Sequence, residues 1–309
     1  SIQSVLCNAG SLVGFLFPFI FTWIGISNIA PQGVVPDSGI YSFYIGAAIL
    51  ILCVIYTTVK VKEMPPAEYA EYHGITEEEE KEKINMVKLL VKAPKAFWTV
   101  GLVQFFCWFA FMFMWTYTNG SVAANVFDAP TVETVVNGVS KVMLDTKSIQ
   151  YQDAADWVGV LFAVQAIGSV LWAVCIPLFK DRKLIYSLSL VLGGLGFIST
   201  YFVHNQYVLF ISFLLIGCAW AAMLALPFTI LTNALSGGHM GTYLGLFNGT
   251  ICIPQIVAAS LGGSILALFT PQGMLPPEIN MLVMAGVMLI IGSVCVYLIK
   301  ETKGEQAKA

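Results

Sequence analysis

The chain is built from long apolar runs separated by short polar segments. Most runs hold about 20 residues or more, the length that a helix rising about 1.5 Å per residue needs to cross about 30 Å of hydrocarbon. The two longest runs contain Pro227 and Pro254, where we expect a tilt, a break or an extension past the bilayer. The pattern predicts eight transmembrane helices, over residues 4–26, 40–60, 97–119, 157–179, 184–204, 207–235, 240–270 and 279–299.

Composition agrees with the pattern. Hydrophobic residues make up 58% of the chain and charged residues 11%, with a mean hydropathy of +0.80. A typical soluble domain has about 25% charged residues, so water is not the main solvent of this protein. The predicted fold class is therefore an all-α, polytopic membrane protein.

The basic residues are distributed unevenly between the two sides of the predicted membrane. Lys141 and Lys147 fall on one side, and the other 13 of the 15 Lys and Arg residues fall opposite. Lys and Arg are retained in cytoplasmic loops, so both ends of the chain are predicted to be cytoplasmic. The residues on the predicted cytoplasmic side are Lys60, Lys62, Lys81, Lys83, Lys88, Lys92, Lys95, Lys180, Arg182, Lys183, Lys300, Lys303 and Lys308.

Two polar segments divide the apolar runs. Segment 61–96 is strongly charged, and its part 84–92 has the pattern of an amphipathic helix on the inner leaflet, although a solvated linker fits the acidic run as well. It separates two helices in 1–60 from six helices in 97–309. Segment 120–156 lies on the opposite side, where we expect an exposed loop with one short surface helix around 132–144.

A shift of 240 residues aligns the first two runs with the last two. It matches Leu6 with Leu246 and Asn8 with Asn248, and it also matches Lys60 with Lys300, the basic residue that ends each second helix. Parallel repeats of this kind occur in transporters. We therefore expect a parent of twelve helices in two six-helix bundles, with this chain equivalent to helices 5 to 12.

Four elements of the sequence form a recognisable series. They are the aromatic run 104–111, the stretch 156–163, the short basic loop 180–183, and Gly245-Leu246-Phe247-Asn248 followed by Ile253-Pro254-Gln255. In this order and spacing they resemble the major facilitator superfamily, and within it the sucrose-transporter-like glycoside or disaccharide:cation symporters and their bacterial relatives. The resemblance implies that fold and a bacterial inner membrane as the location. In the plant members the outer end of the helix that carries the first element is acidic, whereas 115–119 is neutral here.

The residues within the predicted spans do not favour catalysis. Asp, Glu, Lys, Arg and His are absent from the middle of every run, and the seven Cys residues form no CxxC pair. A hydrolase or metalloenzyme needs a nucleophile with a base, or a cluster of ligands. We expect no enzyme activity, no cofactor, no metal and no nucleic-acid partner.

Neutral hydrogen-bonding and aromatic side chains supply a candidate binding site instead. Amides offer donors and acceptors that match sugar hydroxyls, and aromatic faces pack on the C–H faces of a pyranose. Gln104, Trp108 and Trp115 are four and seven residues apart, which places them on one side of a helix. Amides also serve simply to bond neighbouring helices, and for Gln165 that alternative stays open. The predicted substrate-binding residues are Gln104, Trp108, Trp115, Tyr117, Gln165, Asn233, Asn248 and Gln255.

These features predict a secondary active transporter that moves a small neutral sugar by alternating access, with a proton or another cation as the coupling ion. The carboxylate that would carry a proton is expected outside these eight helices. An exporter of amphipathic compounds and a non-transporting membrane sensor are the alternatives. The identity of the sugar, the direction of transport and the oligomeric state stay open.

Overall fold

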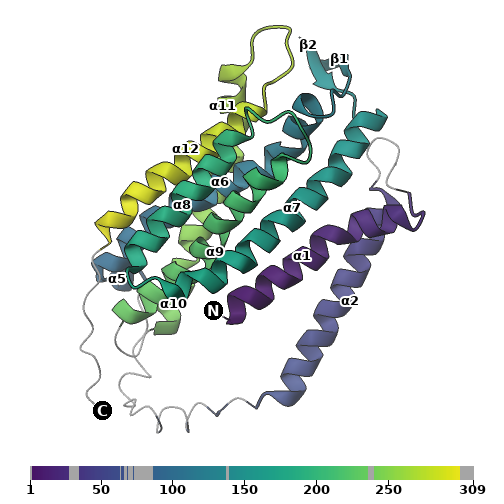
Figure 1. Ribbon diagram of the computed structural model, residues 1–309. Coiled ribbons are helices and arrows are strands. Elements are labelled where there is room, and N and C mark those ends of the chain that lie inside the picture. The colour runs from purple at the N-terminus through teal and green to yellow at the C-terminus, as the bar shows by residue number, and fades with distance from the viewer. Residues whose placement is uncertain are drawn as a thin grey trace.

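The computed structural model describes residues 2–27, 35–62, 64–65, 68, 72, 86–136, 139–235 and 240–299. Long helices run side by side through the molecule, and a small β-hairpin lies at one end (Figure 1). The elements are α1 (Ile2–Trp23), α2 (Asp37–Lys60), α5 (Met86–Val91), α6 (Lys95–Asn125), β1 (Thr131–Val136), β2 (Val139–Leu144), α7 (Ile149–Cys175), α8 (Arg182–Ser199), α9 (Leu209–Ala234), α10 (Met240–Phe247), α11 (Gly249–Phe269) and α12 (Ile279–Cys295), with 3₁₀ turns at Ile176–Leu178 and Val296–Leu298.

Eight helical segments in the described residues are long and apolar enough to cross a membrane, which confirms the predicted number. The run predicted over 240–270 is one of them, although it contains two helices. α10 ends at Phe247 and α11 begins at Gly249, with Asn248 in a turn between them. The interruption is therefore at Asn248, whereas Pro254 and Pro227 lie inside α11 and α9.

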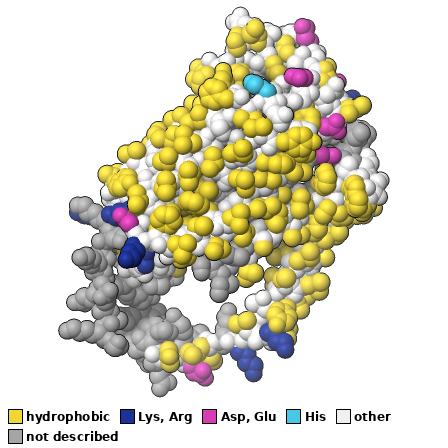
Figure 2. Space-filling model, viewed as in Figure 1, with side chains coloured by type: hydrophobic (Ala, Val, Ile, Leu, Met, Phe, Trp, Pro, Cys, Tyr) yellow, Lys and Arg dark blue, Asp and Glu magenta, His cyan; other side chains and the backbone are white. Residues whose placement is uncertain are grey.

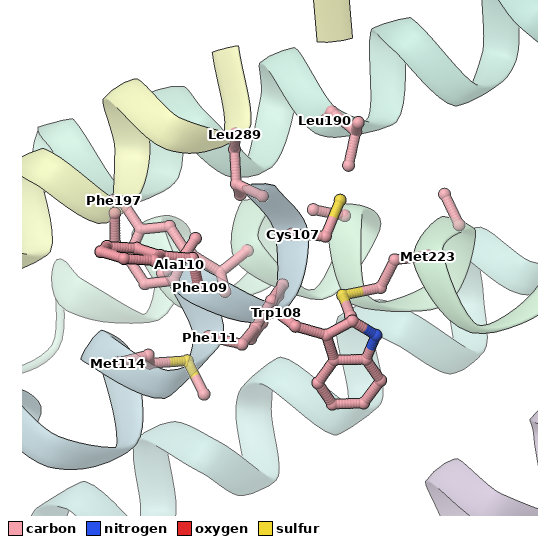
Figure 3. Packing of buried hydrophobic residues seen from close by; sticks show 14 of the residues in the cluster. Cys107, Trp108, Phe109, Ala110, Phe111, Met114, Leu190, Phe197, Met223 and Leu289 are labelled. Atoms are coloured by element: carbon pink, nitrogen blue, oxygen red, sulfur yellow. The ribbon is translucent and has the colours of Figure 1, made fainter. Parts of the chain in front are cut away.

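Helix α6 is the most buried element of the bundle. It packs against α12, α11, α9 and α7, while α8 fills the space between α9 and α12. Figure 3 shows the core around Cys107 and Phe111 of α6, with Leu190 of α8 and Leu289 of α12 among the buried side chains. Helix α1 packs against α7, where the Phe15 and Phe162 ring centroids are 5.3 Å apart.

Glycine allows close approach of the helices at two crossings. A Cβ atom added at Gly217 of α9 would overlap the Gln165 carbonyl oxygen of α7 and would lie 2.7 Å from the Ser169 nitrogen. A Cβ atom added at Gly286 of α12 would lie 2.6 Å from the Gly194 oxygen of α8. Membrane helices associate largely through such van der Waals contact, so these glycines set the separation of the pairs.

Helices α7 and α8 are also joined by a hydrogen bond, in which the Trp172 indole N–H donates to the Ser189 hydroxyl oxygen at 2.8 Å. Ser189→Ala removes the acceptor and leaves a partly buried N–H without its partner. We expect this change to lower the free energy of unfolding by about 1 kcal/mol. Denaturant unfolding in detergent measures it, with Ser187→Ala as the matched control, a second buried serine on α8. Equal losses in the two variants would contradict the assignment.

The segment around 132–144 forms a hairpin, so the predicted surface helix was wrong. β1 and β2 pair antiparallel, with Thr131 opposite Leu144 and Val136 opposite Val139. β1 has the sequence TVETVV and β2 contains two valines, and these β-branched side chains favour the extended backbone. The Asp145 N–H donates to the Pro130 carbonyl at 2.8 Å and closes the open end of the hairpin.

Charge is segregated between the two ends of the bundle. Figure 2 shows Lys and Arg gathered at the end away from the hairpin, and most Asp and Glu at the hairpin end. Short helix α5 lies at the basic end, where the Tyr243 hydroxyl of α10 donates to the Leu89 carbonyl at 3.2 Å. It covers part of the predicted amphipathic segment, whereas the acidic run 77–83 lies outside the described residues.

Candidate substrate site

The three residues predicted to share one side of α6 all lie next to α9. The Gln104 side-chain nitrogen donates to the Met223 carbonyl of α9 at 3.3 Å. Toward the C-terminal end of α6, the ring centroids of Trp108 and Trp115 each lie 5.8 Å from the ring centroid of Trp220. The two helices run antiparallel, so positions of increasing residue number on α6 lie opposite positions of decreasing residue number on α9.

The aromatic rings at this junction form a tryptophan cluster, made of Trp108, Trp115 and Trp220 together with Phe111. The Trp220 ring is perpendicular to both other indoles, at 78° and 83°, and its centroid is 4.9 Å from that of Phe111. Trp108 is 9% exposed and Trp115 is 38% exposed. The cluster therefore extends from the core to an open aromatic surface, which is the kind of surface on which a sugar ring packs.

Two polar atoms beside the tryptophan cluster are buried without a hydrogen-bond partner in the described part of the chain. They are the Gln104 side-chain oxygen and the Trp108 indole nitrogen, one helical turn apart on α6. Figure 3 shows the Trp108 indole beside Met223. Buried polar groups are nearly always paired, and an unpaired one costs about 1–3 kcal/mol. The Gln104 oxygen and the Trp108 N–H are therefore an acceptor and a donor that the described residues leave unpaired.

Helix α7 contributes a second polar pair, Gln165 and Ser169, on its side facing α9. The side-chain oxygens of both are buried and have no partner among the described residues. Their backbone atoms lie against Gly217, one turn of α9 from Trp220. Gln165 is thus adjacent to the same stretch of α9 as the tryptophan cluster.

The other predicted site residues are placed differently. Tyr117 packs its ring 5.5 Å from Phe113, and its hydroxyl lies against Gly262 of α11, nearer the hairpin end. Asn233 and Asn248 are exposed and Gln255 is partly buried. Within the described residues these three amides make no hydrogen bond, and no contact ties them to the tryptophan cluster.

Trp220 is not among the predicted substrate-binding residues, although it is an aromatic residue within a predicted span. It lies in an apolar helix and has no polar neighbour in sequence. Its position in the tryptophan cluster depends on the packing of α9 on α6, which a single sequence does not specify.

Comparison with known families decides the class of protein. The family model described as Major Facilitator Superfamily matches residues 122–309. The chain belongs to the major facilitator superfamily. It is therefore an integral membrane protein of a transporter family, and alternating access is the mode of transport that membership brings.

The facilitator is also similar to a solved structure, a bacterial homolog to the human lysosomal transporter Spinster in an inward-facing and occupied conformation. The two are 17% identical, with a TM-score of 0.48, over 100% of this chain and 68% of that chain. No curated protein matches this chain.

Membership in the superfamily indicates where along the helices a substrate site is expected. Substrate sites in such transporters lie near the bilayer midplane, between helices. Gln104 and Trp108 are in the middle of α6, well away from Lys95 and Asn125 at its ends.

Proposed function

We propose that this facilitator carries a small neutral sugar, a disaccharide or similar glycoside, and binds it on the junction of α6 and α9. The observation that carries the proposal is the pairing of an edge-to-face aromatic cluster with an unpaired acceptor and donor, Gln104 and Trp108. A sugar hydroxyl donates to the amide oxygen and another accepts from the indole N–H. The pyranose C–H face packs on the open side of Trp115.

The resemblance to sucrose-transporter-like symporters supports the same substrate class. Gln104 and Trp108 belong to the aromatic run that carries this resemblance, and Asn248 and Gln255 belong to its last element. On this proposal, residues 1–60 are the last two helices of one bundle, and 97–309 form the second, with 61–96 linking them. Rocking of the bundles exposes the site to each side in turn, with a proton or another cation as the coupling ion.

Export of amphipathic compounds is the second candidate, because aromatic rings outnumber the unpaired polar atoms at this junction. The tryptophan cluster holds four aromatic rings beside two such atoms, and an apolar wall accepts chemically varied ligands. The two unpaired polar atoms favour the sugar. A sugar must fill them, whereas an apolar compound leaves them unpaired at a cost.

Uptake of labelled sucrose and maltose into vesicles containing the full-length protein tests the proposal. We expect saturable uptake that an uncoupler abolishes, with empty vesicles as the control. Absence of sugar uptake by protein shown to be folded and inserted would refute the proposal. Binding of varied amphipathic compounds by that same protein would favour the exporter, and binding of sugar without flux would favour the sensor.

A further inference from the structure

The hairpin end of the bundle holds an acidic side chain in an unusual position. Glu278 precedes α12 directly, after Pro276 and Pro277, and its carboxylate packs on Gly120 of α6. A Cβ atom added at Gly120 would overlap the carboxylate, so only glycine leaves room for it there. The acid is thus seated in the contact between α12 and α6 rather than in open solvent.

Tyrosines surround the seated carboxyl, and basic residues do not. Tyr117 of α6 and Tyr151 of α7 are the titratable groups that face it in the described part of the chain. Burial, with no contribution from a Lys, Arg or His, raises the pKa of the Glu278 carboxyl to about 7. Without a compensating cation, the packed position keeps the neutral acid populated up to about pH 7.

The residue next to Gly120 in sequence is also polar. The Asn119 side chain interacts with Tyr151 of α7, one of the two tyrosines that face the carboxyl, and its oxygen is buried. The carboxyl is therefore packed on Gly120 among neutral polar side chains, and none of these supplies a positive charge that would hold the carboxylate.

We propose that the Glu278 carboxyl, seated on Gly120 between α12, α6 and α7, is a proton-binding site of this protein. A proton taken from water converts the carboxylate to the neutral acid and stabilises the contact of α12 with α6, and release of that proton restores the charge and weakens the contact. The site lies at the end that the Lys and Arg distribution places outside the cell. On this proposal the proton is the coupling ion. That role in transport rests on the proposed function, whereas the binding of a proton by Glu278 does not depend on it.

The pH dependence of folding has a definite sign at this site. The folded-state pKa of the carboxyl, about 7, lies above its ordinary value of 4.5, so the folded protein holds the proton more tightly. The contribution of Glu278 to the free energy of unfolding is fully present below pH 4.5 and is lost as the pH rises through about 7. Glu278→Gln mimics the neutral acid and removes this dependence.

Infrared titration of the full-length protein tests proton binding without any sugar. We expect a protonated carboxyl band that disappears around pH 7 in the wild type and is missing from Glu278→Gln. Glu133→Gln, at an exposed acid of the hairpin, is the matched control and keeps the band. Melting of wild-type protein across the same pH range gives a second readout if the variant folds poorly. An identical band in Glu278→Gln, or a wild-type melting temperature that does not change through pH 7, would overturn the proposal.

Transport separates the role in coupling from the role in binding. We expect Glu278→Gln to retain exchange of labelled sugar between vesicle interior and exterior, and to lose accumulation driven by a pH gradient. Accumulation equal to that of the wild type would overturn the coupling role. If wild-type protein moves no sugar, the proposed function fails while the infrared titration still decides whether Glu278 binds the proton.

Discussion

Replacing Trp220 with Ala is expected to reduce sugar uptake about tenfold or more at low sugar concentration. Its ring contacts Trp108, Trp115 and Phe111, so the truncation removes the centre of the tryptophan cluster. A tenfold loss corresponds to about 1.4 kcal/mol of binding free energy, within the range that one aromatic contact supplies. Initial rates of labelled disaccharide uptake measure the effect.

A matched control separates binding from general damage. Trp98 is also on α6 but is 52% exposed, and its ring lies edge-to-face with that of Phe97 rather than in the tryptophan cluster. Trp98→Ala should leave the uptake rate near that of the wild type. Trp108→Phe keeps an aromatic ring in place and removes only the indole N–H donor, so it should weaken sugar binding while the melting temperature stays close to that of the wild type. Equal effects of Trp220→Ala and Trp98→Ala would contradict the placement of the site.

Replacing Gly217 with Leu is expected to abolish assembly of the folded bundle. The Cβ atom of the new side chain would overlap the Gln165 carbonyl oxygen and would lie too close to the Ser169 nitrogen. Both atoms belong to the α7 backbone, which cannot move aside as a flexible side chain can. Overpacking of a tight core costs about 1–3 kcal/mol for smaller insertions, and here a whole helix must move. The yield of monodisperse protein in detergent and its melting temperature measure the outcome.

Gly263→Leu on α11 is the control for that substitution. An added Cβ atom at Gly263 meets nothing within 4 Å in the described structure, and Leu favours a helix more than Gly does. Its yield should match that of the wild type. A Gly217→Leu protein as stable as Gly263→Leu would show that α7 and α9 do not pack as closely as described.

The helices were predictable because one local property determines them. A helix that crosses a bilayer must be apolar over about 20 residues, and that signal does not depend on what the helix packs against. The count of eight spans was therefore right. The interruption at Asn248 was not predicted, because it depends on the turn geometry between α10 and α11 and not on the proline at 254.

The hairpin was missed although its signal is present in the sequence. Residues 131–136 are rich in Val and Thr and residues 139–144 contain two Val, and Asn137-Gly138 stands between the two stretches, a dipeptide that favours a two-residue turn. The helix prediction relied on the position of this segment between two transmembrane spans. It gave too little weight to the β-branched residues in the segment. A count of matches to the strand pattern would have found it.

The candidate site was predictable only in part, because pairing of helices is not a local property. The spacing of Gln104, Trp108 and Trp115 assigns them to one side of α6, but only the structure shows that α9 lies there and brings Trp220. Glu278 was missed for a related reason. It falls outside the predicted run beside two prolines, where an acid is normally solvated, and its burial comes from Gly120 about 160 residues earlier in the chain.

Exchange of a labelled disaccharide across vesicles that contain the same unlabelled sugar on both sides is the most direct test of the central claim. It requires a site that opens to each side in turn and needs no ion gradient. We expect saturable exchange by the wild-type protein, and slower exchange by Trp220→Ala at the same protein density. Folded, inserted protein that exchanges no sugar, or a Trp220→Ala rate equal to that of the wild type, would contradict the account.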